Sequence, residues 1–151
     1  MKCLLCRQDT ATEFLNPGMQ PLANKYPTKD QFATEDFFPL VIHFCTTCKN
    51  VQLGQIVSRE RMFTDYYYLS SVNPGLVRHF EEFAKQLENA RFVVDIGSND
   101  GILLRPLKLL GVKAVGVEPS VNVSKLANDE GLETITSFFD APTVANAANG
   151  L

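Results

Sequence analysis

Two CxxC pairs constrain this chain more than any other feature of its sequence. Cys3 and Cys6 form one pair, Cys45 and Cys48 form the other, and no cysteine is left over. A CxxC turn can point both thiolates at one ion, and two such turns together make a tetrahedral shell of four sulfurs. We therefore predict a metal site with these four cysteines as ligands, and zinc is favoured over iron.

A closed shell of four sulfurs leaves no open position for a substrate, so the predicted role of the metal is structural. The other interpretations of the cysteines are buried core residues, a redox-active CxxC, or iron held in the same geometry. His43 lies two residues before Cys45 and could replace a ligand. An outward-facing strand residue is the favoured interpretation of His43, because four sulfurs already complete the shell.

Composition narrows the class of protein. The chain has 151 residues, 45% of them hydrophobic, and a net charge of −3. The hydrophobic content is sufficient for a core. The net charge provides no broad basic surface for a nucleic-acid backbone, so we expect no nucleic-acid partner. No apolar stretch has the length of a signal peptide or a membrane span, so we expect no membrane association and a cytoplasmic location. In that compartment cysteines are more often metal ligands than disulfide partners.

The character of the sequence changes twice along the chain. Residues 1–57 contain both cysteine pairs, four of the eight prolines and short apolar runs, which favour short strands and loops in a small zinc-binding domain. Residues 58–72 mix charges with three consecutive tyrosines and are interpreted as a connector. Residues 73–151 then alternate between helical and strand patterns.

This alternation predicts a parallel sheet. The fold class is α/β: a small zinc-binding β-rich domain followed by an incomplete Rossmann-like parallel sheet. The expected strands are 92–96, 113–118 and 132–136, and the expected helices are 74–88, 102–111 and 122–130, with Pro106 able to bend or delay the second helix.

The phrase VVDIGSNDG places Asp95 at a strand end, Gly97 in the following turn, and Gly101 where a helix begins. A dinucleotide fingerprint requires GxGxxG, but Asn99 and Ile102 occupy its second and third glycine positions. Both departures weaken a nicotinamide interpretation. S-adenosylmethionine has no phosphate, so its site tolerates a side chain at the middle position. The alternative is an ordinary strand-to-helix turn without a ligand.

Glu118 ends the next expected strand. A carboxylate at this point can accept hydrogen bonds from both ribose hydroxyls, in nicotinamide sites and in methyl-donor sites alike. A solvated acidic residue is the alternative for Glu118 taken singly. In the correct order on successive strands, the turn and the carboxylate together predict a nucleoside site.

Several phrases of the sequence resemble the sugar C-methyltransferase family. They are CLLC, PLAN, FPL, CTTCKNVQL, YYYLSS, DIGSNDG and GVEPS, and they run from Cys3 to about Phe139. The resemblance implies a zinc-binding N-terminal domain, a class I S-adenosylmethionine-dependent methyltransferase domain, and a nucleotide-linked keto-deoxysugar as the substrate. Such a reaction needs a base beside the keto group and the exclusion of water from the enolate.

The resemblance also implies roles for individual residues. Tyr66 and Tyr68 fit a tyrosine pattern near the family's active site, although packing is an equal alternative for them. Phe138 could pack on adenine, with a core position as the alternative. The zinc ligands match Cys3, Cys6, Cys45 and Cys48, and the methyl-donor residues match Asp95, Gly97, Asn99, Gly101, Glu118, Pro119 and Ser120.

The chain departs from the family at its other end, because it offers three of the seven strands of a class I methyltransferase sheet. The catalytic residues stay unknown, since His79 does not match the family's histidine. We expect an N-terminal part that is inactive by itself, while the parent protein is a C-methyltransferase. The open sheet edge predicts self-association. The alternative function is a zinc-stabilised binding module without catalysis, and the sequence does not identify the sugar or its methylated carbon.

Overall fold

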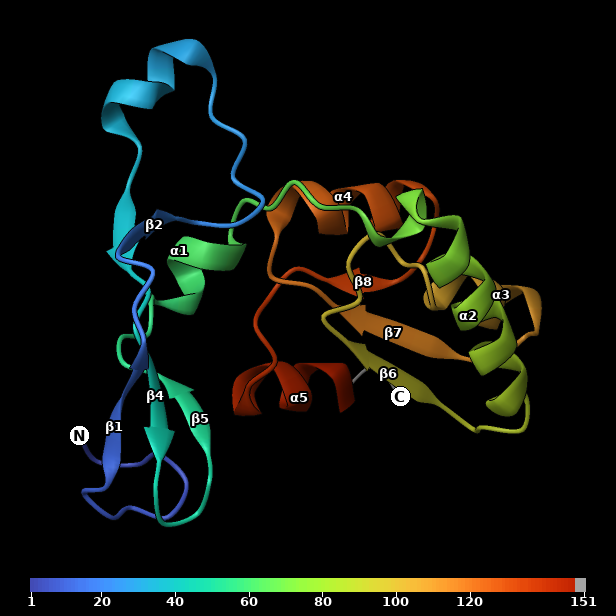
Figure 1. Cartoon of the computed structure of the whole chain (residues 1–151). Helices are drawn as coiled ribbons and strands as arrows, with labels where there is room; N and C mark the ends of the chain where they lie inside the picture. The colour runs from blue at the N-terminus through green and yellow to red at the C-terminus, as the bar shows by residue number, and fades with distance from the viewer. Residues whose placement is uncertain (149–151) are drawn as a thin grey trace. The chain divides into compact units, whose positions relative to one another are not determined.

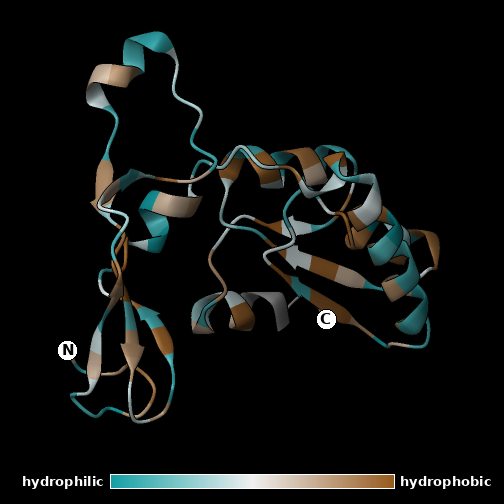
Figure 2. Cartoon of the chain, viewed as in Figure 1, coloured by the Kyte–Doolittle hydropathy of each residue, from teal (hydrophilic) through white to brown (hydrophobic). Residues whose placement is uncertain are grey.

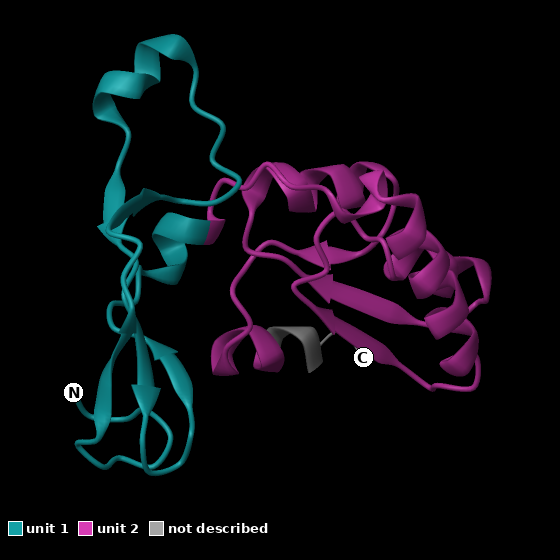
Figure 3. Cartoon of the chain, in the orientation of Figure 1, with its two compact units in different colours: residues 1–62 teal, residues 63–151 magenta. Residues whose placement is uncertain are grey.

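The computed structural model describes residues 1–148, with side chains described through residue 145. The chain divides into two compact units, residues 1–62 and residues 63–151 (Figure 3). Residues 63–72, which the sequence assigns to the connector, fold as part of the second unit.

The first unit consists of short strands and turns (Figure 1). Its three-stranded antiparallel sheet has the order β1-β4-β5, and β2 pairs with β3 in a separate antiparallel ribbon. The β-rich character expected from the prolines and short apolar runs is confirmed. The elements are β1 (Ala11–Leu15), β2 (Met19–Pro21), the 3-10 helix η1 (Lys29–Thr34), β3 (Phe37–Pro39), β4 (Ile42–Cys45), β5 (Val51–Leu53) and α1 (Arg59–Phe63).

The core of the first unit is very small. Its buried cluster consists of Cys3, Ala11 and Cys45, and Cys6 and Cys48 pack against it. Large apolar side chains such as Phe14 remain exposed instead of joining this cluster. The sulfur atoms therefore occupy the place that aliphatic side chains fill in an ordinary domain.

The second unit is a parallel sheet with helices, in the strand order β6-β7-β8. The expected alternation of strand and helix is confirmed. Its α3 begins only at Leu104, so that Pro106 lies in the first turn, where no backbone donor is needed. The elements are η2 (Ser70–Val72), α2 (Pro74–Gln86), β6 (Val93–Ile96), α3, ending at Leu109, β7 (Ala114–Val117), α4 (Val121–Asp129), β8 (Thr134–Ile135) and α5 (Ala141–Ala148).

Aliphatic side chains form the core of the second unit. Ala84 of α2 packs with Leu103 and Leu107, and Leu104 packs with Ala127 of α4. These two clusters lie on one face of the sheet. Figure 2 shows the apolar stretches of β6 and β7 that contribute to this layered arrangement.

The edge of β6 that faces away from β7 is less well covered. Among the described residues β6 pairs with β7 alone, and Ile96 at its end is 59% exposed. Self-association through this edge stays a prediction. In the described part of the chain, every helix falls short of the length and apolarity that a membrane span requires.

Candidate functional site

The four cysteines come together as a single cluster. Their sulfur atoms all lie within 4.8 Å of one another. The Sγ atoms of Cys3 and Cys48 are 3.6 Å apart, and those of Cys6 and Cys45 are 3.7 Å apart. A tetrahedral ion with metal–sulfur bonds of about 2.3 Å requires sulfurs separated by about 3.8 Å. The donor set and its spacing therefore fit zinc, and the sequence-based expectation of a four-cysteine cluster is confirmed.

Each CxxC pair has the same local backbone structure. The first cysteine of each pair accepts a backbone hydrogen bond from the residue four positions later, at 3.1 Å in Arg7–Cys3 and 2.9 Å in Lys49–Cys45. Arg7 and Lys49 follow the second cysteine of their pairs and have φ values of 63° and 65°. This left-handed step closes each turn, so that both sulfurs of a pair face the same point.

Backbone N–H groups of these turns stabilise the thiolate form. The N–H of Cys48, and then the hydroxyl of Thr10, lower the pKa of Cys45 to about 6. The N–H of Cys6 likewise lowers the pKa of Cys3. Deprotonated sulfur is the form that binds a metal, so the turns prepare Cys3 and Cys45 as ligands, whereas burial and the neighbouring cysteines raise the pKa of Cys6 to about 12.

Gln52 on β5 fixes the first cysteine turn from outside the cluster. Its Oε1 accepts from the N–H of Leu4 at 2.8 Å, and its Nε2 donates to the carbonyl of Lys2 at 3.3 Å. Gln52 is buried, so both bonds form away from water. Such an orienting side chain is typical of structural metal sites. No local pattern in the sequence indicates this role of Gln52, because its partners lie about fifty residues away.

His43 does not belong to the sulfur cluster. The expectation that it is no ligand agrees with this geometry, but the ring does not project freely into solvent. It is half-buried on β4 and lies so close to Gly54 that a Cβ there would be 2.5 Å from the ring. Gly54 therefore makes room for the His43 side chain.

The glycine turn, residues 97–101, joins β6 to the segment that precedes α3. Gly97, Asn99 and Gly101 all have left-handed backbone conformations, with φ of 75°, 50° and 81°. The two glycines differ in their surroundings. A Cβ on Gly97 would meet no atom within 4 Å, whereas a Cβ on Gly101 would lie 2.4 Å from Leu132 Cδ1. Gly97 therefore presents bare backbone to open space, and Gly101 is required by packing.

Glu118 lies beside the glycine turn at the carboxyl end of β7. Its Oε2 accepts from the N–H of Asn99 at 3.0 Å, and its Oε1 accepts from the N–H of Ser120 at 2.8 Å. Both bonds are buried. Each carboxylate oxygen has a second lone pair that can accept a hydrogen bond from a ligand.

Asp95 is a second carboxyl group in this region. Burial, and then the nearby charge of Glu118, raise the pKa of Asp95 to about 6. Pro119 is half-buried and Ser120 is buried where the chain leaves β7. The fold therefore brings the sequence-predicted turn residues and Glu118 to one end of the sheet, as the order of the motifs implies.

The tyrosine segment, residues 63–72, is bound to this end of the sheet by polar contacts. The side chain of Asn122 accepts from the N–H of Tyr66 at 3.2 Å and donates to its carbonyl at 2.6 Å. The hydroxyl of Ser120 donates to the carbonyl of Phe63 at 2.6 Å. Tyr66 packs its ring edge-on against Phe63. The segment that carries Tyr66 and Tyr68 is therefore attached to the second unit.

Two further polar groups were not singled out from the sequence. The hydroxyl of Ser98 and Oδ1 of Asp100 are buried without a hydrogen-bond partner in the described residues. Both belong to the glycine turn. Phe138 is half-buried, and its carbonyl accepts from the hydroxyl of Thr143 at 2.9 Å. An adenine-packing role for Phe138 stays a prediction.

A cavity of about 310 Å³ lies elsewhere on the second unit. Val112, Lys113 and Ala114 line it at the start of β7, together with Leu132 and Glu133 before β8. These residues are at the amino ends of the strands. Ligands of parallel sheets bind at the carboxyl ends, where the glycine turn and Glu118 lie.

Comparison with known proteins supports the interpretation of the four-cysteine cluster as a zinc site. Residues 3–63 match the family described as "Putative zinc binding domain", which is grouped with the methyltransferases. The first unit is thus similar to this zinc-binding family over nearly its whole length. Over 147 residues the chain is 30% identical to the C-methyltransferase NovU of Streptomyces niveus, a match that covers 93% of this chain and 35% of that relative. The chain is therefore a relative of a C-methyltransferase and spans about a third of its length.

Proposed function

We propose that this chain forms the zinc-binding part and the first methyl-donor-binding part of an S-adenosylmethionine-dependent C-methyltransferase, whose acceptor is a nucleotide-linked keto-deoxysugar. The observation that carries the proposal is the position of Glu118, whose carboxylate lies one hydrogen bond from the glycine turn. The similarity to a C-methyltransferase over 93% of the chain supports the choice of reaction.

The residues of the turn suit a nucleoside without a phosphate. Gly97 allows close approach because the space beside its Cα is open. Glu118 can accept hydrogen bonds from two ribose hydroxyls while it keeps its backbone donors. A pyrophosphate would instead need bare backbone at position 99, where the side chain of Asn99 is present.

When bound, S-adenosylmethionine supplies an electrophilic methyl group on a sulfonium centre. In the proposed enzyme, Glu118 orients the ribose and Gly97 lies against the ligand. The carboxylate of Glu118 also gives this end of the sheet a negative charge, which favours a cationic ligand. The zinc centre holds the first unit together and takes no part in the transfer, because four sulfurs close its shell.

Calorimetric titration of the chain with S-adenosylhomocysteine, S-adenosylmethionine and NAD tests the nucleoside site. We expect weak binding of S-adenosylmethionine and of its demethylated product S-adenosylhomocysteine, loss of that binding in Glu118→Gln, and no preference for NAD. Glu133→Gln is the matched control, since Glu133 is exposed at the opposite end of the strands. Tighter binding of NAD would contradict the proposal.

The methyl transfer itself is tested with the protein encoded by the whole reading frame. Labelled S-adenosylmethionine and a nucleotide-linked keto-deoxysugar should give a product with a new carbon–methyl bond. If zinc is present but neither S-adenosylmethionine nor S-adenosylhomocysteine binds, the alternative of a zinc-stabilised binding module without catalysis is favoured instead.

A further inference from the structure

Asn99 makes contacts that a glycine at this position could not make. Its Oδ1 accepts from the N–H of Ser70 at 2.8 Å, and its Nδ2 donates to the carbonyl of Tyr68 at 3.1 Å. The side chain thus binds one donor and one acceptor of the tyrosine segment, as a neighbouring strand would. Asn99 is buried, so water competes poorly for either bond.

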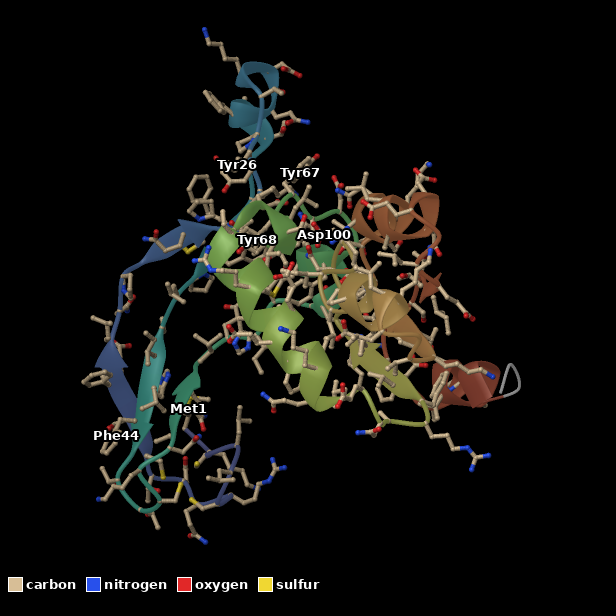
Figure 4. The ribbon with its side chains drawn as sticks, turned by 90° about the vertical axis from the view of Figure 1, so that its right-hand side faces the viewer. Met1, Tyr26, Phe44, Tyr67, Tyr68 and Asp100 are labelled. Carbon is tan, nitrogen blue, oxygen red and sulfur yellow. The ribbon has the colours of Figure 1, made fainter. Side chains whose placement is uncertain are left out.

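Asp100 adds a second attachment next to the first. Its Oδ2 accepts from the N–H of Ser71 at 3.2 Å and also from the Ser71 hydroxyl. Asp100 is buried, so water competes poorly for these two bonds. Figure 4 shows Tyr68 and Asp100 close together.

The backbone of Asn99 is linked to Glu118, while its side chain is linked to Tyr68 and Ser70. Its φ of 50° is one that glycine adopts without strain, so the asparagine is not needed to form the turn. What the side chain adds is the attachment of the tyrosine segment. A single residue therefore connects the carboxylate at the end of β7 with the segment that carries the tyrosines.

We propose that Asn99 and Asp100 are positioning residues that fasten the tyrosine segment to the glycine turn. This proposal rests on the proposed function. The attachment holds Tyr66 and Tyr68 beside the methyl-donor site. Binding of a ligand to the glycine turn and the conformational order of the tyrosine segment therefore affect each other. Such coupling is reciprocal: a ligand that orders the turn also orders the segment.

Hydrogen exchange of the ligand-free chain tests the attachment directly. In Asn99→Gly the turn keeps its backbone conformation, and the amide of Ser70 should exchange at least about tenfold faster. Asn24→Gly is the matched control, because Asn24 is also left-handed, with φ of 61°, but lies in the first unit. Unchanged exchange across residues 63–72 in Asn99→Gly would overturn the proposal.

A rescue experiment separates positioning from general stability. Ser71→Ala removes the hydroxyl that donates to Asp100, whereas Ser71→Thr keeps it. The chain has no tryptophan and four tyrosines, of which Tyr26 alone lies outside the tyrosine segment. In a Tyr26→Phe background, acrylamide should quench tyrosine fluorescence more strongly in Ser71→Ala, and Ser71→Thr should restore the original quenching. Equal quenching in both variants would count against the role of Asp100.

Addition of S-adenosylhomocysteine distinguishes this proposal from the function on which it rests. If the ligand binds, it should slow exchange of the tyrosine segment in the natural chain and not in Asn99→Gly. Slowing of equal size in both would overturn the coupling. Failure of the ligand to bind contradicts the proposed function, and the ligand-free exchange rates then decide the attachment by themselves.

Discussion

The two units of this chain reach a folded state by different means. In the first, the buried cluster consists of two cysteines and one alanine, with the other two cysteines against it. In the second, leucines and alanines of three helices pack together with Val93 and Val112 on a parallel sheet. Apolar burial can therefore stabilise the second unit alone, whereas the first needs the binding energy of a metal. The comparison predicts that the two units respond independently to changes in their cores.

The largest effect should come from removing one sulfur ligand. We expect Cys45→Ser to unfold residues 1–62, because structural zinc supplies roughly 10 kcal/mol or more to such a domain. The second unit should keep its fold. Zinc content and residue-resolved amide spectra measure both effects. Thr47→Ser, in the same turn, is the control, and a Cys45→Ser chain that still holds one zinc and a folded first unit would refute this.

A core truncation in the second unit should give the converse result. Leu107 is fully buried, and Leu107→Ala should lower the free energy of unfolding of the second unit by about 2–5 kcal/mol. Leu109→Ala on the same helix is the control, because Leu109 is 85% exposed. Urea unfolding together with zinc analysis checks the prediction. Loss of zinc from Leu107→Ala would show that the units are not independent.

Asp95 should make the second unit sensitive to pH. The folded state raises the pKa of Asp95 from 3.8 to about 6, so it favours the neutral carboxyl. This favourable contribution is complete below pH about 4 and is lost as the pH rises through about 6. At pH 7 Asp95→Asn should therefore be more stable than the natural chain by about 1–3 kcal/mol.

The advantage of Asp95→Asn should disappear in acid. Urea unfolding followed by circular dichroism between pH 4 and 7 measures it. The exposed Asp129→Asn serves as the control and should show no such gap. A stability difference that stays constant over this range would show that burial of the Asp95 charge is not its cause.

The smallest effect concerns the left-handed residue that closes the first cysteine turn. Arg7 has φ of 63°, a conformation that favours glycine. Arg7→Gly should stabilise the zinc-loaded first unit by about 0.5–1 kcal/mol. Lys49→Gly should gain less, because Lys49 Nζ donates to the carbonyl of Thr46 at 2.6 Å. Thermal melting of the zinc-loaded protein resolves the order, and a destabilised Arg7→Gly would contradict the prediction.

Sequence reasoning worked where the signal was local. The two cysteine pairs, the strand–helix alternation after residue 92 and the turn at Gly97 are all set by short-range patterns. The delayed start of α3 also followed from a single proline, Pro106. Each of these features depends on backbone chemistry within a few residues of the position concerned.

The missed features depend on partners far along the chain. Tyr68 and Asn99 are 31 residues apart in the sequence, and Leu4 and Gln52 are 48 residues apart. No periodic pattern in the sequence predicts hydrogen bonds over such separations. Asn99 could be identified as a departure from a glycine pattern. What its side chain binds became visible only when the fold brought the tyrosine segment to the glycine turn.

Removal of the metal tests the contrast between the units most directly. Under reducing conditions, a chelator should be titrated into the zinc-loaded chain while its amide spectrum is recorded. Signals from residues 1–62 should collapse to unfolded positions as zinc leaves, and signals from residues 63–148 should remain dispersed. A first unit that stays folded without metal, or two units that unfold together, would contradict the account.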